Sequence, residues 1–161
     1  MKVYTSYFYQ IRFFKPYLIP LSTAVWDPKW FHQGYGADYK FLDKNGVING
    51  LRARPFMPDE RCEGLCRGPE LCKTKDSNTC AFLKQYYNQL NELDFDETLA
   101  RFKILGARCQ DTMGFIEEPE YALIFHETPV NPCSERIVVT KWFNEHNYDI
   151  KEWSRKDLQT V

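Results

Sequence analysis

The sequence predicts an α/β fold, in which a mostly parallel sheet is flanked by helices in a Rossmann-like three-layer arrangement. Residues 121–125 form a continuous apolar run, which is typical of a strand buried on both faces of a parallel sheet. A helical pattern over residues 132–146 follows it, and then a strand-like segment at 149–153. Strand, helix and strand in this order form a βαβ unit, whose two strands run parallel.

Two more strands are expected near the start of the chain. Residues 3–8 combine β-branched and aromatic side chains, and residues 18–25 are a second short apolar run. Glycine and proline recur between residues 26 and 60 without a sustained helix or strand period. We expect a long insertion there, with one short helix near residues 39–42.

Helices are expected over residues 80–93, from 94 or 96 to about 105, and over 132–146. Short polar residues precede each of them, and such residues accept hydrogen bonds from the free N–H groups of a first helical turn. The expected caps are Thr79, Asp94 or Asp96, and Asn131. Gly106 is expected near the end of the second helix, and Pro132 in the first position of the third.

The composition predicts a single α/β domain over residues 1–161. Hydrophobic residues make up 43% of the chain and aromatic residues 16%, which is enough for a substantial core. The formal net charge is −1, so the chain has no broad basic field of the kind that draws a protein to nucleic acid. No apolar run reaches the roughly 18 residues of a membrane span, and no signal-peptide pattern is present, which favours a cytoplasmic protein.

Four cysteines gather in a segment rich in turn-forming residues, residues 61–80. Cys62, Cys66, Cys72 and Cys80 have the spacing C-x3-C-x5-C-x7-C. Four thiolates fit tetrahedral Zn²⁺, and we expect a cysteine-rich, metal-stapled insertion. A 4Fe-4S cluster is the alternative metal group, because it is also held by four thiolates. Free buried thiols, or disulfides in an exported chain, are further alternatives.

Polar residues follow the predicted strands, at the edge where ligands bind in open α/β sheets. The candidate ligand-binding residues are Ser6, Tyr7, Ser22, Trp26, Ser134 and Arg136. A helix start offers free N–H groups to an anion, and an arginine adds a forked donor. Glu127 is the candidate acid–base residue and Cys133 the candidate nucleophile. Each has a structural alternative: a solvated acid, a small packing cysteine, a capping serine, a surface ion pair or a core aromatic ring. His126 is expected to be structural.

Both ends of the chain resemble a known family. The segments at residues 3–8, 20–24 and 121–127, followed by Cys133 and Arg136, are similar to domain-of-unknown-function family 488, found in bacteria and their phages. The resemblance implies a compact α/β domain with its site at the strand ends, and it implies no reaction. Phe125 stands where the family has a strand cysteine, and Ser134-Glu135 where it has a histidine. The cysteine segment is an insertion relative to the short form of the family.

These observations lead to two functional hypotheses. In the first, the protein binds or acts on a nucleotide, a nucleobase or another small anionic ligand, with Glu127 as acid–base group and Arg136 holding the anion. In the second, it is a non-enzymatic accessory protein of a phage or bacterium, which contacts a protein or nucleic acid through the metal-stapled loop. The dinucleotide-binding, Walker, zinc-protease and deaminase motifs are absent from the sequence.

Overall fold

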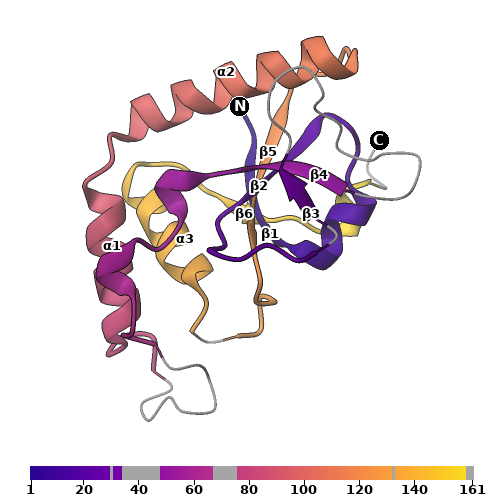
Figure 1. Ribbon diagram of the computed structural model, residues 1–161. Coiled ribbons are helices and arrows are strands. Elements are labelled where there is room, and N and C mark those ends of the chain that lie inside the picture. The colour runs from indigo at the N-terminus through magenta and orange to yellow at the C-terminus, as the bar shows by residue number, and fades with distance from the viewer. Residues whose placement is uncertain (30, 34–47, 67–75, 132, 159–161) are drawn as a thin grey trace.

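The computed structural model describes residues 1–29, 31–33, 48–66, 76–131 and 133–158. Its centre is a sheet of six strands in the order β3-β4-β2-β5-β1-β6, and every strand pair is parallel. The strands are β1 (Val3–Tyr7), β2 (Leu18–Ser22), β3 (Phe31–Gln33), β4 (Ile48–Arg52), β5 (Glu120–Phe125) and β6 (Lys151–Glu152). The predicted α/β class and parallel sheet are therefore confirmed (Figure 1).

The two faces of the sheet carry separate apolar clusters, because successive side chains of a strand point to opposite faces. On β5, Tyr121, Leu123 and Phe125 join the larger cluster under the helices. Ala122 and Ile124 join a smaller cluster on the other face, with Phe8 of the 3-10 helix η1 (Phe8–Phe13), and with Trp153. Both faces of this central strand are thus buried, as its continuous apolar run predicts.

Three α-helices pack on or beside the larger cluster. They are α1 (Ala81–Asn91), α2 (Phe95–Met113) and α3 (Glu135–Glu145). In Figure 1, α1 and α3 lie together on one side of the sheet, η1 and the C-terminal segment lie on the other, and α2 runs across the end where the N-terminus lies. Trp142 and Phe143 of α3 are fully buried, and Leu83, Tyr86 and Leu90 line the buried face of α1.

Two expected helix starts differ from the structure. The N-cap of α1 is Cys80 rather than Thr79, and its side chain makes no capping hydrogen bond. The N-cap of α3 is Ser134 rather than Asn131, and Ser134 Oγ accepts the N–H of Arg136. Asn131 instead accepts the N–H of Cys133 at its own Oδ1, in a turn before the helix. Asp94 caps α2 as expected.

The second helix is longer than expected, because Gly106 lies inside it rather than at its end. α2 continues to Met113 and ends at Gly114, whose φ of 74° is the left-handed conformation that glycine favours. A Cβ at Gly106 would lie 2.0 Å from the Tyr121 hydroxyl oxygen. The glycine therefore serves the close approach of α2 to β5.

The segment expected to be an irregular insertion contributes two strands to the sheet, β3 and β4. Leu51 of β4 pairs with Leu21 of β2, and Phe31 of β3 pairs with Ile48 of β4. Two short 3-10 helices follow, η3 (Arg54–Phe56) and η4 (Glu60–Cys62). The short helix expected at residues 39–42 lies outside the described residues. Among the described helices, none has the length and apolar character to cross a membrane.

Candidate functional site

The carboxyl ends of the parallel strands meet along one edge of the sheet, which is called the carboxyl edge below. Ser6 of β1 and Ser22 of β2 both lie in register with Ile124 of β5, and Arg52 of β4 lies in register with Ser22. Glu127 lies two residues after the end of β5, and α3 starts at the same edge. The structure thus brings the polar residues predicted from the strand ends to one side of the molecule.

Arg136 joins three strand ends to α3 through a side chain that is only 9% exposed. Its Nη2 donates to the carbonyl of Ser6 at 3.1 Å, and its Nη1 donates to the carbonyl of Glu127 at 3.0 Å. Its Nε lies 2.8 Å from the carboxylate of Glu152, which also accepts the hydroxyl of Thr5. Every guanidinium nitrogen has an acceptor within the protein. This geometry favours a structural role over the anion-binding role predicted for Arg136.

Glu127 and Glu135 bring two carboxyl groups together at the start of α3. Burial, followed by the negative charge of Glu127 and a hydrogen bond between the two side chains, raises the pKa of Glu135 to about 8. The hydroxyl of Ser134 donates to Glu127 at 3.5 Å. Burial and the neighbouring carboxylate therefore favour the protonated form of Glu135. Sequence reasoning missed Glu135, because an acid in the first turn of a helix is ordinarily explained by the helix dipole.

A second polar cluster lies at the ends of β2 and β4. The hydroxyl of Ser22, which is fully buried, donates to Asp27 Oδ1 at 2.5 Å. Arg52 Nε donates to Asp27 Oδ2 at 3.1 Å, and the two side chains are 27% and 7% exposed respectively. Of the three residues, sequence reasoning named Ser22 as a site residue and missed the Asp27–Arg52 pair. The signal was an acid five residues after Ser22, in the loop that leaves the strand.

Trp26 is exposed to solvent in the loop after β2, and this loop is hydrogen-bonded to β5 and to His126. The residue is 81% exposed, and its carbonyl oxygen is hydrogen-bonded to Nε2 of His126. The His126 ring packs against Phe8, with 4.8 Å between the ring centroids. Directly after β2, Thr23 bonds the carbonyl of Ile124 through both its N–H and its hydroxyl. The backbone that carries Trp26 is thus anchored, while its indole is free to contact a ligand.

Three other predicted site residues have less specific surroundings. The phenol oxygen of Tyr7 accepts a hydrogen bond from Gln10 at 2.7 Å, within its own segment of chain. Ser6 is fully buried, and its Oγ has no hydrogen-bond partner within the described part of the chain. Cys133 is half-buried just before α3, so the suggested nucleophile lies near Glu135, and its role stays a prediction.

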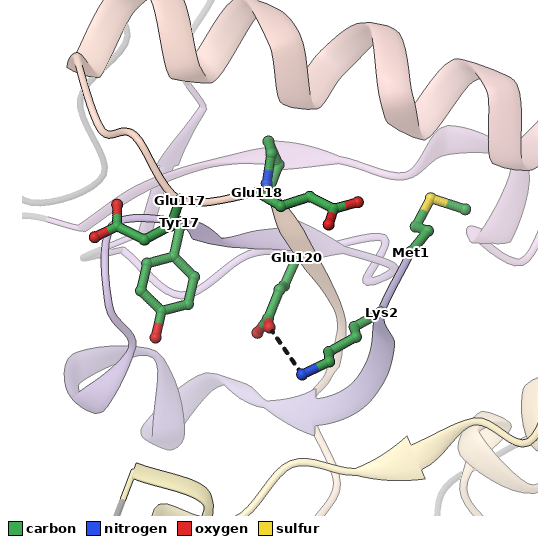
Figure 2. Close-up of a pocket in the computed structure, with 7 residues that line it drawn as sticks. Met1, Lys2, Tyr17, Glu117, Glu118 and Glu120 are labelled. Atoms are coloured by element: carbon green, nitrogen blue, oxygen red, sulfur yellow. Dashed lines mark ion pairs between the residues drawn. The ribbon is translucent and has the colours of Figure 1, made fainter. Parts of the chain in front are cut away.

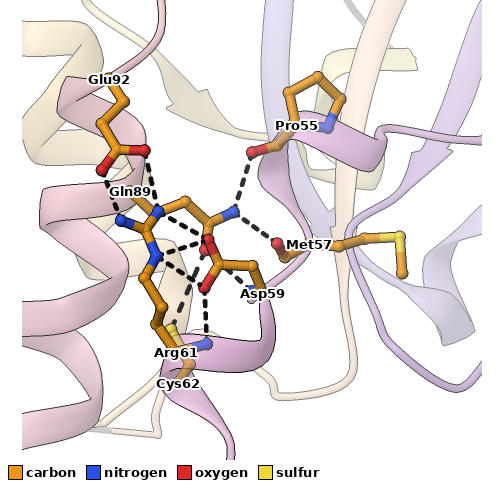
Figure 3. A network of polar contacts seen from close by, with 7 residues as sticks. All are labelled: Pro55, Met57, Asp59, Arg61, Cys62, Gln89 and Glu92. Atoms are coloured by element: carbon orange, nitrogen blue, oxygen red, sulfur yellow. Dashed lines mark hydrogen bonds and ion pairs between the residues drawn. The ribbon is translucent and has the colours of Figure 1, made fainter.

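The cysteine segment enters the core through a hydrogen-bond network around Gln89 of α1 (Figure 3). Gln89 Nε2 donates to the carbonyls of Pro55 and Met57, and its Oε1 accepts the N–H of Asp59 at 2.9 Å. The Sγ of Cys62 lies 3.9 Å from the same Oε1. These contacts hold residues 55–62 against α1 and place the Cys62 thiol in the apolar core.

The described cysteines do not form a metal site with one another. Cys62 is 2% exposed, and burial raises the pKa of its thiol, which disfavours the thiolate that a metal binds. Cys66 is exposed and Cys80 caps α1. Among the residues that the structure describes, no three His, Cys, Asp or Glu side chains are grouped to hold a metal ion. Cys72 lies outside those residues. The expectation of a metal-stapled insertion gains no support here, for zinc or for an iron–sulfur cluster.

A hollow of about 340 Å³ lies at the opposite edge of the sheet (Figure 2). Its lining includes Glu117, Glu118 and Glu120, and Glu120 is paired with Lys2 at 3.6 Å. Glu117 and Glu118 are exposed, as in an ordinary solvated surface. Ligands of open α/β sheets bind beyond the carboxyl ends of the strands, so this amino-edge hollow is not the candidate site.

Three comparisons with known proteins complete the description of the site. No family model matches the chain, and neither a curated protein nor a solved structure matches it.

Proposed function

We propose that the protein binds a ligand containing a nucleobase at the carboxyl edge, and that the Glu127–Glu135 pair exchanges a proton with it. The observation that supports this most directly is the contact between the two carboxyl groups, one after the central strand β5 and one at the start of α3. Charged groups are rarely buried together without a purpose, and perturbed carboxyl pairs are common at functional sites. The structural alternative is an ion-pair network around Arg136.

A carboxyl pair with one proton suits the edge of a nucleobase. It offers one O–H donor beside several acceptor oxygens, and a base edge presents N–H donors beside ring-nitrogen or carbonyl acceptors. Carboxyl groups that share a hydrogen bond are closer than the roughly 5–9.5 Å that separates the two acids of glycoside hydrolases. The pair is therefore proposed to act as one acid–base unit.

Trp26 supports the choice of a ring-containing ligand. Its indole is exposed at the same edge, and every nucleobase has a flat face that stacks on an aromatic side chain. Trp26 belongs to the loop after β2, the strand next to β5. We also propose that the chain is related to family 488. The residues that carry the resemblance, Glu127, Cys133 and Arg136, lie around the start of α3.

Calorimetric titration with adenosine, guanosine, cytidine and uridine tests the proposal. At least one nucleoside is expected to bind the wild-type protein, and Glu127→Gln and Glu135→Gln are expected to weaken that binding about tenfold. In wild type the binding enthalpy is expected to depend on the buffer, because protons are exchanged. In Glu135→Gln this dependence is expected to disappear.

Glu117→Gln is the matched control, since Glu117 is an exposed carboxylate at the opposite edge of the sheet. It is expected to bind as wild type does. Absence of binding by all four nucleosides at millimolar concentration would overturn the proposal. Equal affinities of wild type and both glutamine variants at the pair would do so as well.

A further inference from the structure

We propose that Arg52 forms an anion subsite that binds a phosphate group of the ligand. This inference deepens the proposed function, and rests on it, by naming a nucleoside monophosphate as the ligand class. The sequence alone suggested Arg136 for this task, but all the guanidinium nitrogens of Arg136 have acceptors within the protein. Arg52 is the arginine at the carboxyl edge whose described contacts leave most of its donors available.

The Asp27 carboxylate orients the Arg52 guanidinium and leaves most of its N–H donors available. A guanidinium has five N–H donors, and the described contacts engage one of them, at Nε. Asp27 is itself buried and accepts a hydrogen bond from the Ser22 hydroxyl, so the ion pair with Asp27 holds the Arg52 side chain in one orientation. The two Nη groups form the fork that binds phosphate oxygens in pairs. Fixing the fork in advance lowers the entropy lost on binding.

The surrounding charge is complementary to a phosphate. The segments at residues 24–29 and 48–52 contain two cations, Lys29 and Arg52, against the single acid Asp27. Lys29 is exposed. The Glu127–Glu135 pair at the end of β5 is acidic by contrast. One edge of the sheet thus offers a cationic end and a proton-exchanging acidic end to one ligand.

The spacing of the strands suits a ligand that reaches both ends. β4 and β5 are separated only by β2, so their ends lie roughly 10 Å apart at the usual spacing of neighbouring strands. Trp26 belongs to the loop that leaves β2, between them in strand order. A base stacked on Trp26 would place its polar edge toward one end and its phosphate toward the other.

Two titrations test the subsite separately from the proposed function. In the first, inorganic phosphate is added to ¹⁵N-labelled protein, and the Arg52 Nε–Hε signal is followed by NMR. A saturable shift at millimolar phosphate is expected in wild type. It is expected to persist in the control Arg54→Met, an exposed arginine two residues away. In Arg52→Met, whose own reporter is lost, the phosphate-dependent shifts of neighbouring backbone amides are expected to disappear.

In the second titration, the best nucleoside is compared with its 5′-monophosphate. The phosphate is expected to improve affinity about ten- to a hundredfold in wild type and in Arg54→Met, and not in Arg52→Met. Asp27→Asn is expected to retain only part of the gain, since the fork is then less well fixed. Affinity for the nucleoside itself is expected to be unchanged in Arg52→Met.

Each outcome separates the two proposals. If nucleosides bind but the phosphate gain is absent from wild type, or survives in Arg52→Met, the subsite is wrong and the proposed function stands. If inorganic phosphate binds through Arg52 while no nucleoside binds, the subsite stands and the nucleobase proposal is wrong. If neither probe binds, both are overturned.

Discussion

Two arginines at the carboxyl edge have opposite surroundings. Arg136 is almost entirely buried, and its donors go to Glu152 and to the carbonyls of Ser6 and Glu127. Arg52 is about a quarter exposed, and in the described part of the chain only its Nε has a partner, the carboxylate of Asp27. Arg136 therefore stabilises the fold, while Arg52 has N–H donors available at the surface. The two arginines share a position at the carboxyl edge and differ in how many of their guanidinium N–H groups have partners among the described residues.

The largest expected effect comes from Arg136→Met. Burial already raises the pKa of Glu152, and removal of Arg136 would leave this carboxylate with the Thr5 hydroxyl but without its cation, and would take a donor from two carbonyls. We expect a loss of about 3–5 kcal/mol in the free energy of unfolding, measured by urea denaturation. Replacing Glu152 by Met as well is expected to restore part of this loss, because the unpaired acid is then gone. A single-variant loss below about 1 kcal/mol would contradict the structural role.

The next effect concerns the proton on the Glu127–Glu135 pair. The folded-state pKa of Glu135 is raised to about 8 from 4.5, so the folded protein binds more protons than the unfolded chain between those pH values. Stability contributed by this group is therefore lost as pH rises through that window. Glu135→Gln is expected to remove this loss, so the variant is expected to be more stable than wild type at pH 8 and to differ from it less at pH 5.

Urea denaturation at pH 5 and at pH 8 measures the difference. The control Glu117→Gln is expected to follow wild type at both values, because Glu117 is exposed far from the pair. The same pH dependence in wild type and in Glu135→Gln would show that the two carboxyl groups do not share a buried proton.

The strands at the centre of the sheet could be predicted from sequence, while those at one edge could not. β1, β2 and β5 carry apolar and β-branched runs that identify them locally. β4 reads Ile-Asn-Gly-Leu-Arg, a poor strand sequence by propensity, and it forms because Leu51 and Arg52 pair with β2. Such a strand is specified by its neighbour, which local patterns do not reveal.

The positions of the candidate site residues could be predicted from sequence, but their hydrogen-bond partners could not. Residues after parallel strands must meet at one edge, so Ser22, Glu127 and Ser134 could be placed there from sequence. Whether the N–H donors of an arginine are already hydrogen-bonded within the protein depends on acceptors that lie far away in the sequence. Arg136 and the Ser6 carbonyl are 130 residues apart. The cysteines were grouped as metal ligands because they lie close together in the sequence. In the structure, Cys62 at the end of η4 lies in the core beside Gln89, away from solvent.

A smaller effect is expected from Arg52→Met, and it sharpens the contrast between the arginines. Arg52 is 27% exposed, so removal of its guanidinium admits water to Asp27, which also keeps the hydrogen bond from the Ser22 hydroxyl. We expect a loss of about 1 kcal/mol or less in the free energy of unfolding. The measurement is the same urea titration used for Arg136→Met. A loss equal to that of Arg136→Met would mean that Arg52 is a structural residue too, and would remove the reason to assign it a ligand.

The smallest effect is expected at two serines that lie in register with the same residue of β5. Ser22 and Ser6 are both fully buried beside Ile124. The Ser22 hydroxyl donates to Asp27 and accepts the N–H of Ala24, while that of Ser6 has no partner among the described residues. Ser22→Ala is expected to cost about 1 kcal/mol, because Asp27 loses a donor. Ser6→Ala is expected to change stability by less than about 0.5 kcal/mol, or to raise it, since an unpaired buried hydroxyl is removed.

The Ser6 result also bears on the site. A hydroxyl without a protein partner at the carboxyl edge is either bonded to water or kept for a ligand. If Ser6→Ala leaves stability unchanged but weakens nucleoside binding by more than about threefold, Ser6 belongs to the ligand site. If it changes neither, the hydroxyl is incidental, and the ligand contacts lie on the Trp26 and Arg52 side of the edge. A loss above about 1 kcal/mol would instead show that the Ser6 hydroxyl has a structural partner, and would place both serines in the closed part of the fold.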